Sequence, residues 1–278
     1  MITLSQLGFG YGAQAPLFQN VSLTIPTGRC VALLGANGQG KSTLLKLLAG
    51  ALTPKSGNLR VLDEIPRQRS PQLYQQLFFV PDQLELPPIS GQRYLDRFGL
   101  FYPGFDAERC AQLLTRFEVD PSNTLTELSL GQCKKFYLAF ALSSGCRLLL
   151  LDEPTNGLDI PAKAVLRDWI ARHLDDEQTV LIATHQIKDI DASVDALLLL
   201  AHGGVHWFDL WELPKSVAQS IGPQAPEHSL YHESRAGLCH ALVPARGTPP
   251  CEIDLELLFN AFHHNFTGMM VELEPEAA

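Results

Sequence analysis

One glycine-rich loop contains the residues whose chemical role is easiest to assign, Gly35-Ala36-Asn37-Gly38-Gln39-Gly40-Lys41-Ser42-Thr43. The loop matches the pattern G-x-x-x-x-G-K-[ST] and stands between a short apolar run and a helical pattern that begins at Lys41. Glycines let successive backbone N–H groups turn towards phosphate oxygens, and the N-terminus of the following helix adds partial positive charge. Lys41 would reach the β- and γ-phosphate oxygens, and the Ser42 hydroxyl would ligate Mg²⁺. We therefore predict that the following residues bind a nucleotide: Gly35, Asn37, Gly38, Gly40, Lys41, Ser42 and Thr43.

A second candidate site follows the apolar run 148–151, where Asp152 and Glu153 stand directly before Pro154. Acids at the carboxyl end of a fully apolar strand lie where ligands bind in open α/β sheets. Asp152 is expected to hold Mg²⁺ directly or through water, and Glu153 to polarise the attacking water. The alternative is a buried strand that ends in a solvated acidic turn, and the glycine-rich loop upstream favours the nucleotide site over it.

Short strands and helices that alternate along the chain must position these residues. Strands are expected at 2–7, 21–25, 30–34, 77–80, 148–151 and 179–183, and helices from Lys41, in two or three segments of 90–127, from about Gly131, and at 162–174. The strand–helix–strand order around the acidic run predicts a parallel sheet there. Beyond about Lys215 prolines interrupt the pattern, and 253–262 is the one convincing amphipathic helix expected in this part.

Composition narrows the class of protein further. The 278 residues are 46% apolar and 18% charged, which excludes a disordered chain, and the net charge of −9 disfavours a protein that grips nucleic acid along its length. No apolar run is long enough to span a bilayer, and the N-terminal residues do not resemble a signal peptide. The chain is therefore expected in the cytoplasm, with its six scattered cysteines reduced.

A third motif, Leu128-Ser129-Leu130-Gly131-Gln132, precedes the acidic strand by roughly twenty residues and opens a helix. It resembles the signature of ABC ATPases, whose usual form is Leu-Ser-Gly-Gly-Gln. Tyr11 stands where an aromatic ring stacks on adenine in that family, the segment 156–159 resembles the D-loop with Asp159, and His185 resembles the switch histidine. Six elements in the family's order make the resemblance specific, and it covers about residues 2–214.

The resemblance implies an α/β fold: a P-loop NTPase core with a mixed sheet, an N-terminal antiparallel β subdomain and an inserted α-helical subdomain at about 88–145. The ATPase domain would cover residues 1–215, and 216–278 would form a small C-terminal appendage. In this family ATP is sandwiched between two subunits, so that Ser129, Gly131, Gln132 and Asp159 would face the nucleotide of a second subunit, in a homodimer or a heterodimer. Lys41, Glu153 and His185 would carry catalysis, with ATP and Mg²⁺ as cofactors.

Two positions depart from the family's pattern. Leu130 replaces the first signature glycine, so its side chain must point away from the nucleotide and its backbone cannot need a conformation reserved for glycine. The family usually has glutamine, a Mg²⁺ ligand, directly after the segment that here is Leu77-Phe78-Phe79-Val80-Pro81, but Asp82 stands in this place, followed by Gln83. Either Asp82 takes the metal-facing role or the register shifts by one to Gln83.

The resemblance as a whole predicts a cytoplasmic ATPase subunit that docks on separate integral membrane subunits at the inner face of the cell membrane and powers transport. The tail segment 253–259 is similar to the Leu- and Glu-rich closing segment of ATPases of ABC-2-type exporters, which favours export. The alternative is a soluble ABC ATPase that acts on nucleic acid or ribosomes. The acidic balance, the single ATPase domain and the lack of a long coiled-coil insertion disfavour that alternative, and no nucleic-acid partner is expected. A regulatory module that binds ATP without hydrolysing it is disfavoured by Lys41, Asp152, Glu153 and His185.

Overall fold

The computed structural model describes residues 1–12, 15–174, 176–245 and 253–273. The chain forms two compact units. The first comprises Met1–Val194 and Leu198–His206, and the second comprises Asp195–Leu197 and Trp207–Ala278. The second unit thus begins, along its main stretch, at Trp207 rather than near residue 216.

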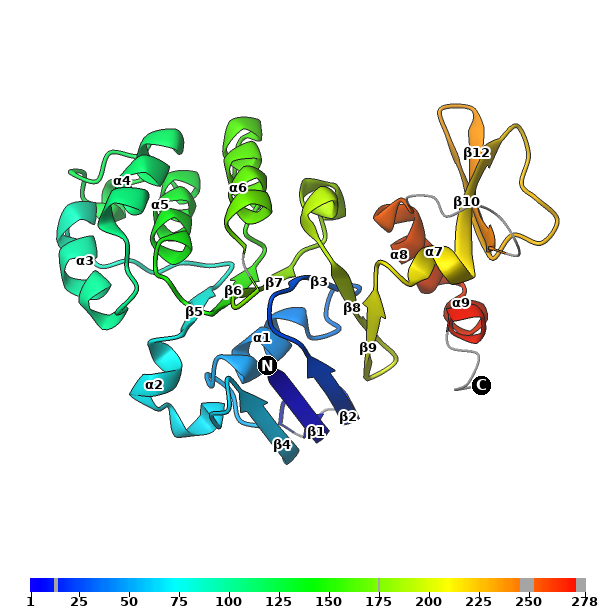
Figure 1. Ribbon diagram of the computed structural model, residues 1–278, viewed down its shortest axis with the longest axis horizontal. Coiled ribbons are helices and arrows are strands. Elements are labelled where there is room, and N and C mark those ends of the chain that lie inside the picture. Colours follow the sequence, from blue (N-terminus) through cyan, green and yellow to red (C-terminus); the bar gives the residue numbers. More distant parts are fainter. Residues whose placement is uncertain (13–14, 175, 246–252, 274–278) are drawn as a thin grey trace. The chain divides into compact units, whose positions relative to one another are not determined.

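An antiparallel three-stranded sheet opens the first unit, with strand order β2-β1-β4 (Figure 1). Its strands are β1 (Ile2–Phe9), β2 (Phe18–Ile25) and β4 (Ser56–Val61). Leu4 of β1 lies opposite Leu23 on one side and Leu59 on the other. The strands expected at 2–7 and 21–25 are confirmed and run longer, whereas β4 was missed because its residues 56–58 are small or polar and exposed.

The central sheet has the order β5-β6-β7-β3-β8-β9. Its strands are β3 (Cys30–Leu34), β5 (Leu77–Val80), β6 (Leu148–Asp152), β7 (Thr179–Ala183), β8 (Ala196–Ala201) and β9 (Gly204–Asp209). The four strands from β5 to β3 are paired in parallel, which confirms the parallel pairing predicted for β6 and β7. Strands β3, β6 and β7 are buried at every position, which explains their continuous apolar runs. Parallel strands end at one edge of a sheet, so the segments after β3, β5, β6 and β7 meet there.

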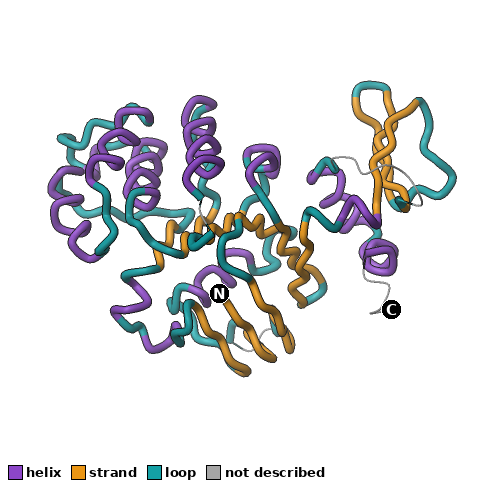
Figure 2. Tube along the Cα trace, viewed as in Figure 1, coloured by secondary structure: helices purple, strands orange, loops and turns teal. Residues whose placement is uncertain are grey.

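The helices of the first unit are α1 (Lys41–Leu48), α2 (Pro71–Tyr74), α3 (Gly91–Phe98), α4 (Ala107–Arg116), α5 (Leu130–Leu142) and α6 (Ile160–His173). Single 3₁₀ turns occur at Pro66–Gln68, Gly99–Phe101, Leu125–Glu127, Ile187–Asp189 and Asp191–Ser193. Figure 2 shows α3, α4 and α5 grouped together as the inserted helical part. The expected helices in 90–127 are confirmed, with a break at Pro103-Gly104.

Aromatic side chains join this helical part to β5. The ring of Phe78 lies 5.1 Å from that of Tyr102 and 5.2 Å from that of Phe140, measured between centroids. Tyr94 of α3 contacts Phe136 and Phe140 edge-on. Aromatic pairs of this kind contribute roughly 0.5–1.5 kcal/mol each beyond the area they bury. The helix that carries the signature motif is therefore packed directly against the strand that leads to Asp82.

The second unit contains a three-stranded antiparallel sheet of order β10-β12-β11. Its elements are α7 (Leu213–Ser216), β10 (Val217–Gly222), β11 (Tyr231–Arg235), β12 (Leu238–Pro244), α8 (Leu255–His264) and α9 (Phe266–Leu273). The amphipathic helix expected at 253–262 is confirmed as α8, and the structure adds three strands and the helices α7 and α9, which were not predicted from the sequence. Pro223 and Pro226 lie in the β10–β11 connection and Pro244 ends β12, while Pro249 and Pro250 lie outside the described residues. Strand β11 lacks an apolar face because its residues are polar at most positions.

The Arg235 side chain connects the sheet of the second unit to α8. It pairs with Asp254, at 2.6 Å, with Glu256, at 3.3 Å, and with Glu233. Asp254 also caps α8 by accepting a hydrogen bond from the Leu257 backbone N–H at 2.9 Å. In the part of the chain that the structure describes, no helix has the length and apolar character needed to cross a bilayer.

Candidate nucleotide site

The glycine-rich loop connects β3 to α1, as its motif requires. Gly38 and Gly40 have φ values of 83° and 102°, a region that favours glycine, and Gly40 is the N-cap of α1. The Lys41 Nζ donates a hydrogen bond to the Gly35 carbonyl oxygen at 2.7 Å. Burial lowers the pKa of Lys41, and the nearby Glu153 and Asp152 carboxylates oppose that shift. The loop therefore places a cation and the N-terminus of an eight-residue helix at the same point.

Oxygen atoms suited to a hard cation stand next to this loop. The Ser42 hydroxyl donates a hydrogen bond to Asp152 Oδ1 at 3.0 Å, and Asp152 is only 3% exposed at the end of β6. Burial raises the pKa of Asp152, while the bond from Ser42 opposes the rise. Within the described ranges no three His, Cys, Asp or Glu side chains could hold a metal by themselves. The donor set fits Mg²⁺, which takes one or two protein oxygens and completes its shell with phosphate oxygens and water.

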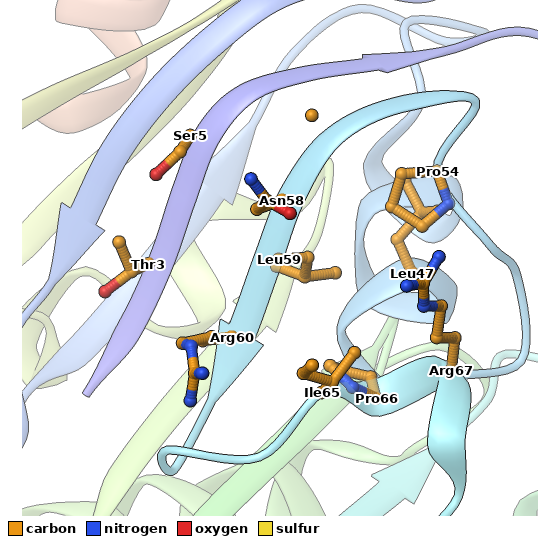
Figure 3. A pocket seen from close by; sticks show the side chains of 11 residues that line it. Thr3, Ser5, Leu47, Pro54, Asn58, Leu59, Arg60, Ile65, Pro66 and Arg67 are labelled. Carbon is orange, nitrogen blue, oxygen red and sulfur yellow. The ribbon is translucent and has the colours of Figure 1, made fainter.

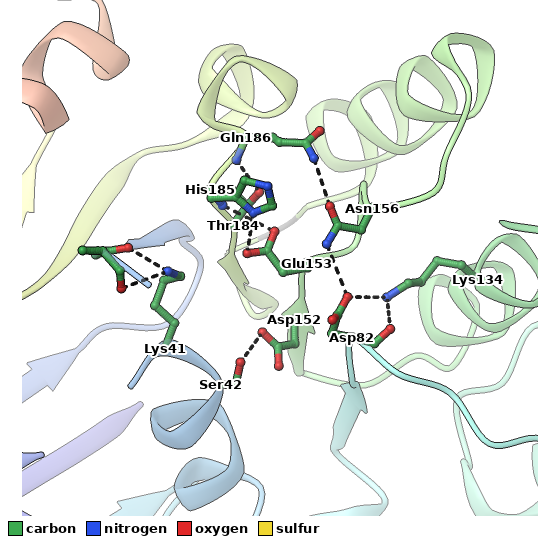
Figure 4. A network of polar contacts seen from close by, with 12 residues as sticks. Lys41, Ser42, Asp82, Lys134, Asp152, Glu153, Asn156, Thr184, His185 and Gln186 are labelled. Carbon is green, nitrogen blue, oxygen red and sulfur yellow. Dashed lines mark hydrogen bonds and ion pairs between the residues drawn. The ribbon is translucent and has the colours of Figure 1, made fainter. Parts of the chain in front are cut away.

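Glu153 and His185 form a pair at the same edge of the central sheet. His185 Nδ1 lies 2.9 Å from Glu153 Oε1 (Figure 4). The Glu153 backbone N–H donates to the Ala183 carbonyl oxygen at 2.8 Å. Glu153 has a φ of 47°, which is unfavourable for a residue with a side chain and costs about 1–2 kcal/mol. A backbone held in this conformation by β7 turns the carboxylate towards His185 rather than along the strand.

The Tyr11 side chain stands at the other wall of the site. It is 46% exposed, and its hydroxyl lies 3.0 Å from the Thr43 Oγ1, so that a hydrogen bond joins the two. Phe9 holds the ring edge-on at 5.1 Å between centroids. Tyr11 thus presents a ring beside the glycine-rich loop.

A cleft of about 550 Å³ collects most of the predicted residues. It is lined by Tyr11, Ala15, Leu17, Asn37, Gly38, Gly40, Lys41, Ser42, Thr43, Asp82, Glu153, Asn156 and His185. Asp82 lines the cleft and Gln83 is not among its lining residues. Seven residues assigned to the nucleotide from sequence therefore surround one space together with both members of the Glu153–His185 pair.

The signature residues lie elsewhere, and intramolecular bonds engage several of them. Ser129 and Gln132 form a capping box at the start of α5: the Gln132 N–H donates to Ser129 Oγ at 3.2 Å and the Ser129 N–H to Gln132 Oε1 at 3.1 Å. Leu130 is 88% exposed, and its backbone φ is not positive, so this position does not require glycine. A Cβ on Gly131 would lie 2.7 Å from the Gly157 carbonyl oxygen, so the start of α5 touches the segment that follows Glu153.

Asp159 likewise does not line the cleft of its own subunit. It caps α6 by accepting from the Ala162 N–H at 2.9 Å, and it forms an ion pair of 2.6 Å with Lys135 of α5. The hydrogen bond from Lys135 is the main cause that lowers the pKa of Asp159. Ser129, Gly131, Gln132 and Asp159 are thus separated from the Lys41 loop within one chain, which is the arrangement that the expectation of a second subunit requires.

A chain of polar contacts that the sequence did not reveal connects Asp82 to the end of β7. Asn156 Nδ2 donates to Asp82 Oδ1 at 3.4 Å, Gln186 Nε2 donates to Asn156 Oδ1 at 2.9 Å, and Lys163 Nζ donates to Gln186 Oε1 at 3.0 Å. Lys134 of α5 contacts the Asp82 segment from the opposite side. The signal available in sequence was weak, because a lysine in a helical pattern is ordinarily assigned to the solvent face.

Another cavity, of about 430 Å³, lies away from all of these motifs. It is bounded by the outer face of β1 and β4, by α1 and by the turn that follows β4 (Figure 3). Polar side chains such as Thr3, Ser5 and Asn58 stand on one side and Leu47, Leu59 and Ile65 on the other. No residue of the glycine-rich loop, the acidic strand or the signature lines this cavity.

Comparison with known families decides the class of protein. The family described as "ABC transporter" matches residues 18–156, which is half of the chain. The chain belongs to the ABC transporter family. The match starts in β2 and ends at Asn156, so it includes the Lys41 loop, the signature and the acidic strand of this ABC protein.

Curated relatives resemble the ABC protein over about two thirds of its length. The ABC transporter ATP-binding protein YtrB of Bacillus subtilis is 31% identical over 193 residues, which cover 69% of this chain and 65% of YtrB. The Nod factor export ATP-binding protein I of Cupriavidus metallidurans is 33% identical over 190 residues, which cover 66% of this chain and 63% of that protein. An arabinose import ATP-binding protein, AraG of Mannheimia succiniciproducens, is 31% identical over 66% of this chain and 39% of its own. The match thus spans just under two thirds of the first two of these relatives, and proteins named for export and for import both match.

Solved structures share the fold. An ATP binding subunit of an ABC transporter superposes with a TM-score of 0.70 at 24% identity and covers 77% of this chain and 91% of its own. A dimeric ATP-binding cassette in a post-hydrolysis state, bound to ADP and Pi, superposes with a TM-score of 0.65 at 23% identity and covers 76% of this chain and 99% of its own. Both likenesses show that the chain has the ABC ATPase fold.

Proposed function

We propose that this chain binds Mg²⁺-ATP and hydrolyses it as the ATPase subunit of a transporter. The observation that carries the proposal is the convergence of Lys41, the Ser42–Asp152 pair and the Glu153–His185 pair on one cleft beside the Tyr11 ring. The family supports the same conclusion, since relatives of this chain are named as ATP-binding proteins of transporters.

Each side chain has a task that follows from its position. The Lys41 ammonium would exchange its bond to the Gly35 carbonyl for phosphate oxygens, and the backbone N–H groups of the loop would hold the same anion. Ser42 and Asp152 would hold Mg²⁺, which neutralises phosphate charge when it is bound. Tyr11 would stack on the adenine ring, because it stands exposed beside Thr43 at the wall of the cleft.

Glu153 is the group best placed to accept a proton from the attacking water. A carboxylate can only accept hydrogen bonds, so the His185 tautomer with a proton on Nδ1 would donate to Glu153 Oε1 across the contact of 2.9 Å. His185 would in this way hold the Glu153 carboxylate in position at the cleft.

The second half of the site would come from another subunit. Ser129, Gly131, Gln132 and Asp159 do not line the cleft of their own chain, while α5 begins with an exposed N-terminus at Leu130. The Ser129 hydroxyl and the Gly131 N–H would bind the γ-phosphate of a partner's ATP, so that ATP closes the dimer and hydrolysis opens it. The dimeric cassette of the same fold supports this arrangement.

The chain would work at the inner face of the cell membrane through integral membrane subunits, which would supply the spans for transport. Export is the direction that the tail segment around α8 favours, and the Nod factor export relative supports it. A soluble ABC ATPase that acts on nucleic acid or ribosomes is the competing function, and the net charge of −9 disfavours it.

The experiment that tests the function compares Glu153→Gln with Ser129→Arg. Glu153→Gln keeps the shape of the side chain and removes the base, so ATP hydrolysis should fall by roughly 10²–10⁴-fold while ATP still drives dimer formation in size-exclusion chromatography. Ser129→Arg leaves the chain's own Lys41 loop untouched and should retain ATP binding but abolish dimerisation and cooperative hydrolysis. Near wild-type turnover in Glu153→Gln would remove Glu153 from its role. Hydrolysis that is independent of protein concentration in both wild type and Ser129→Arg would exclude the shared site.

A further inference from the structure

Lys134 is a buried cation with no role in the site as described so far. Its side chain is 6% exposed, in the second turn of the helix that begins with the signature. Its Nζ donates to the Asp82 carbonyl oxygen at 2.9 Å and lies 3.8 Å from Asp82 Oδ1 (Figure 4). It also donates to the Pro81 carbonyl oxygen at 3.2 Å. All three acceptors belong to the segment that directly follows β5.

The charge on this lysine needs an explanation, because burying an ammonium group costs several kcal/mol unless it is compensated. Burial lowers the pKa of Lys134, and Asp82 is the first of the carboxylates that oppose this shift. Two carbonyl oxygens accept hydrogen bonds from the ammonium, and the Asp82 carboxylate forms an ion pair with it at 3.8 Å. Two hydrogen bonds and one ion pair therefore hold Lys134 beside Asp82.

The carboxylates at the cleft carry negative charge, and Lys134 compensates part of it. Asp82, Asp152 and Glu153 bring three carboxylates to a site that must accept the negative charge of ATP, with Lys41 as the cation of the loop. Asp82 lines this cleft, so an uncompensated charge there would repel a phosphate at short range. A glutamine in the same place would bring no such charge.

We propose that Lys134 is a positioning residue that compensates the Asp82 carboxylate and fixes it at the cleft, so that an acid can stand beside the nucleotide phosphates. This proposal rests on the proposed function. The lysine holds Asp82 through both its main chain and its side chain, and the helix that carries it also carries Ser129. A shift of α5 would therefore move Asp82 as well.

The test is a double-mutant cycle of Lys134→Met and Asp82→Gln in the full chain. The affinity for ATP is measured by calorimetry in excess Mg²⁺ and in EDTA, and the ratio of the two dissociation constants is compared between variants. Lys134→Met should weaken Mg²⁺-free binding by about tenfold, as expected when one carboxylate charge near the phosphates loses its compensating partner at a partly solvated site. In the Asp82→Gln background the same substitution should change that affinity by less than about twofold, because no carboxylate is left to compensate.

Two further variants control for a merely structural effect. Lys134→Arg keeps the charge and should keep the wild-type ratio. Lys135→Met removes the neighbouring lysine of α5, whose side chain is 11% exposed and pairs with Asp159 instead, and it should leave the ratio unchanged. Lys134→Gln repeats the cycle with a donor for the two carbonyl oxygens if the Met variant does not fold.

Three outcomes would overturn the proposal: an equal loss of affinity in both backgrounds, an unchanged ratio in Lys134→Met, or the same change in Lys135→Met. These results differ from a failure of the proposed function, in which the wild-type chain itself does not bind Mg²⁺-ATP. Thermal unfolding of every variant shows whether a loss of affinity comes from the site or from the fold.

Discussion

The contact between Gly131 and Gly157 gives a prediction whose size follows from one distance. In Gly131→Ala the new Cβ would lie 2.7 Å from the Gly157 carbonyl oxygen, closer than real Cβ atoms come to any such atom. The obstacle is backbone rather than a flexible side chain, so α5 and the segment after Glu153 must move apart by a few tenths of an ångström.

Two opposing terms set the effect on stability. Overpacking of this kind costs about 1–3 kcal/mol. Replacing glycine by alanine in a helix contributes at most about 1 kcal/mol in return. The free energy of unfolding should therefore fall by about 0–3 kcal/mol in urea denaturation.

The effect on function should exceed the effect on stability. The shift displaces Ser129 relative to the segment that carries Glu153, and small misplacements of catalytic groups cost up to about 10²-fold. ATP hydrolysis should decrease by about 10- to 100-fold, while ATP affinity of the monomer stays at the wild-type value because the Lys41 loop is untouched.

The matched control is Leu130→Ala, at the adjacent and 88% exposed position. Its free energy of unfolding should change by less than about 0.5 kcal/mol. If Gly131→Ala hydrolysed ATP like the wild type and gained the full helix-propensity term of about 1 kcal/mol, the close contact would have no consequence and the reasoning would be refuted.

Two further predictions concern titration. Burial raises the pKa of both the Cys110 and the Cys146 thiol to about 12. Neither thiol should therefore react with iodoacetamide at pH 8 until the chain is unfolded, which mass spectrometry would show. Rapid labelling of either thiol in the folded chain would contradict its burial. In the second unit, burial raises the pKa of Asp254 and Glu233, but their hydrogen bonds and the Arg235 ion pairs outweigh it and leave both pKa values lowered. The stability that these acids contribute is present above their ordinary pKa values and is lost as the pH falls through the lowered pKa values. Acid unfolding followed by circular dichroism should therefore be less steep in Arg235→Met than in the wild type. Parallel unfolding curves would contradict the assignment.

The central strands and the site that they position could be predicted because burial on both faces leaves a plain signal in the sequence. The strands at Cys30–Leu34, Leu77–Val80 and Thr179–Ala183 have the predicted bounds. Each lies in the parallel part of the sheet, where both faces exclude water and every position tends to be apolar. Once these strands are predicted, the position of a motif that directly follows one of them, such as the Lys41 loop, is predicted as well.

The second unit could not be predicted in the same way, since its strands are short, mixed in polarity and paired at a distance. Tyr231–Arg235 carries a tyrosine and four polar residues, and its stability comes from pairing with Leu238–Pro244 and from the Arg235 ion pairs. Local propensity gives little information about pairing of this kind.

The contact between Lys134 and Asp82 was equally hidden from sequence reasoning. The two residues are 52 positions apart, and their meeting depends on how α5 packs against β5. Helical periodicity identifies the face of a helix, but it does not say which loop that face will meet.

The hydrogen bonds that lead from Lys163 through Gln186 and Asn156 to Asp82 all run in one direction, from donor to acceptor. This direction limits how the side chains can be arranged at the cleft. Lys163 can only donate hydrogen bonds and the Asp82 carboxylate can only accept them, so the amides of Gln186 and Asn156 between them are each held in one of their two orientations. The donor at Lys163 orients the Gln186 amide, which in turn presents its N–H to the Asn156 oxygen and leaves the Asn156 N–H for Asp82. The segments that follow β5, β6 and β7 are thus joined by donors and acceptors that fit together in one arrangement.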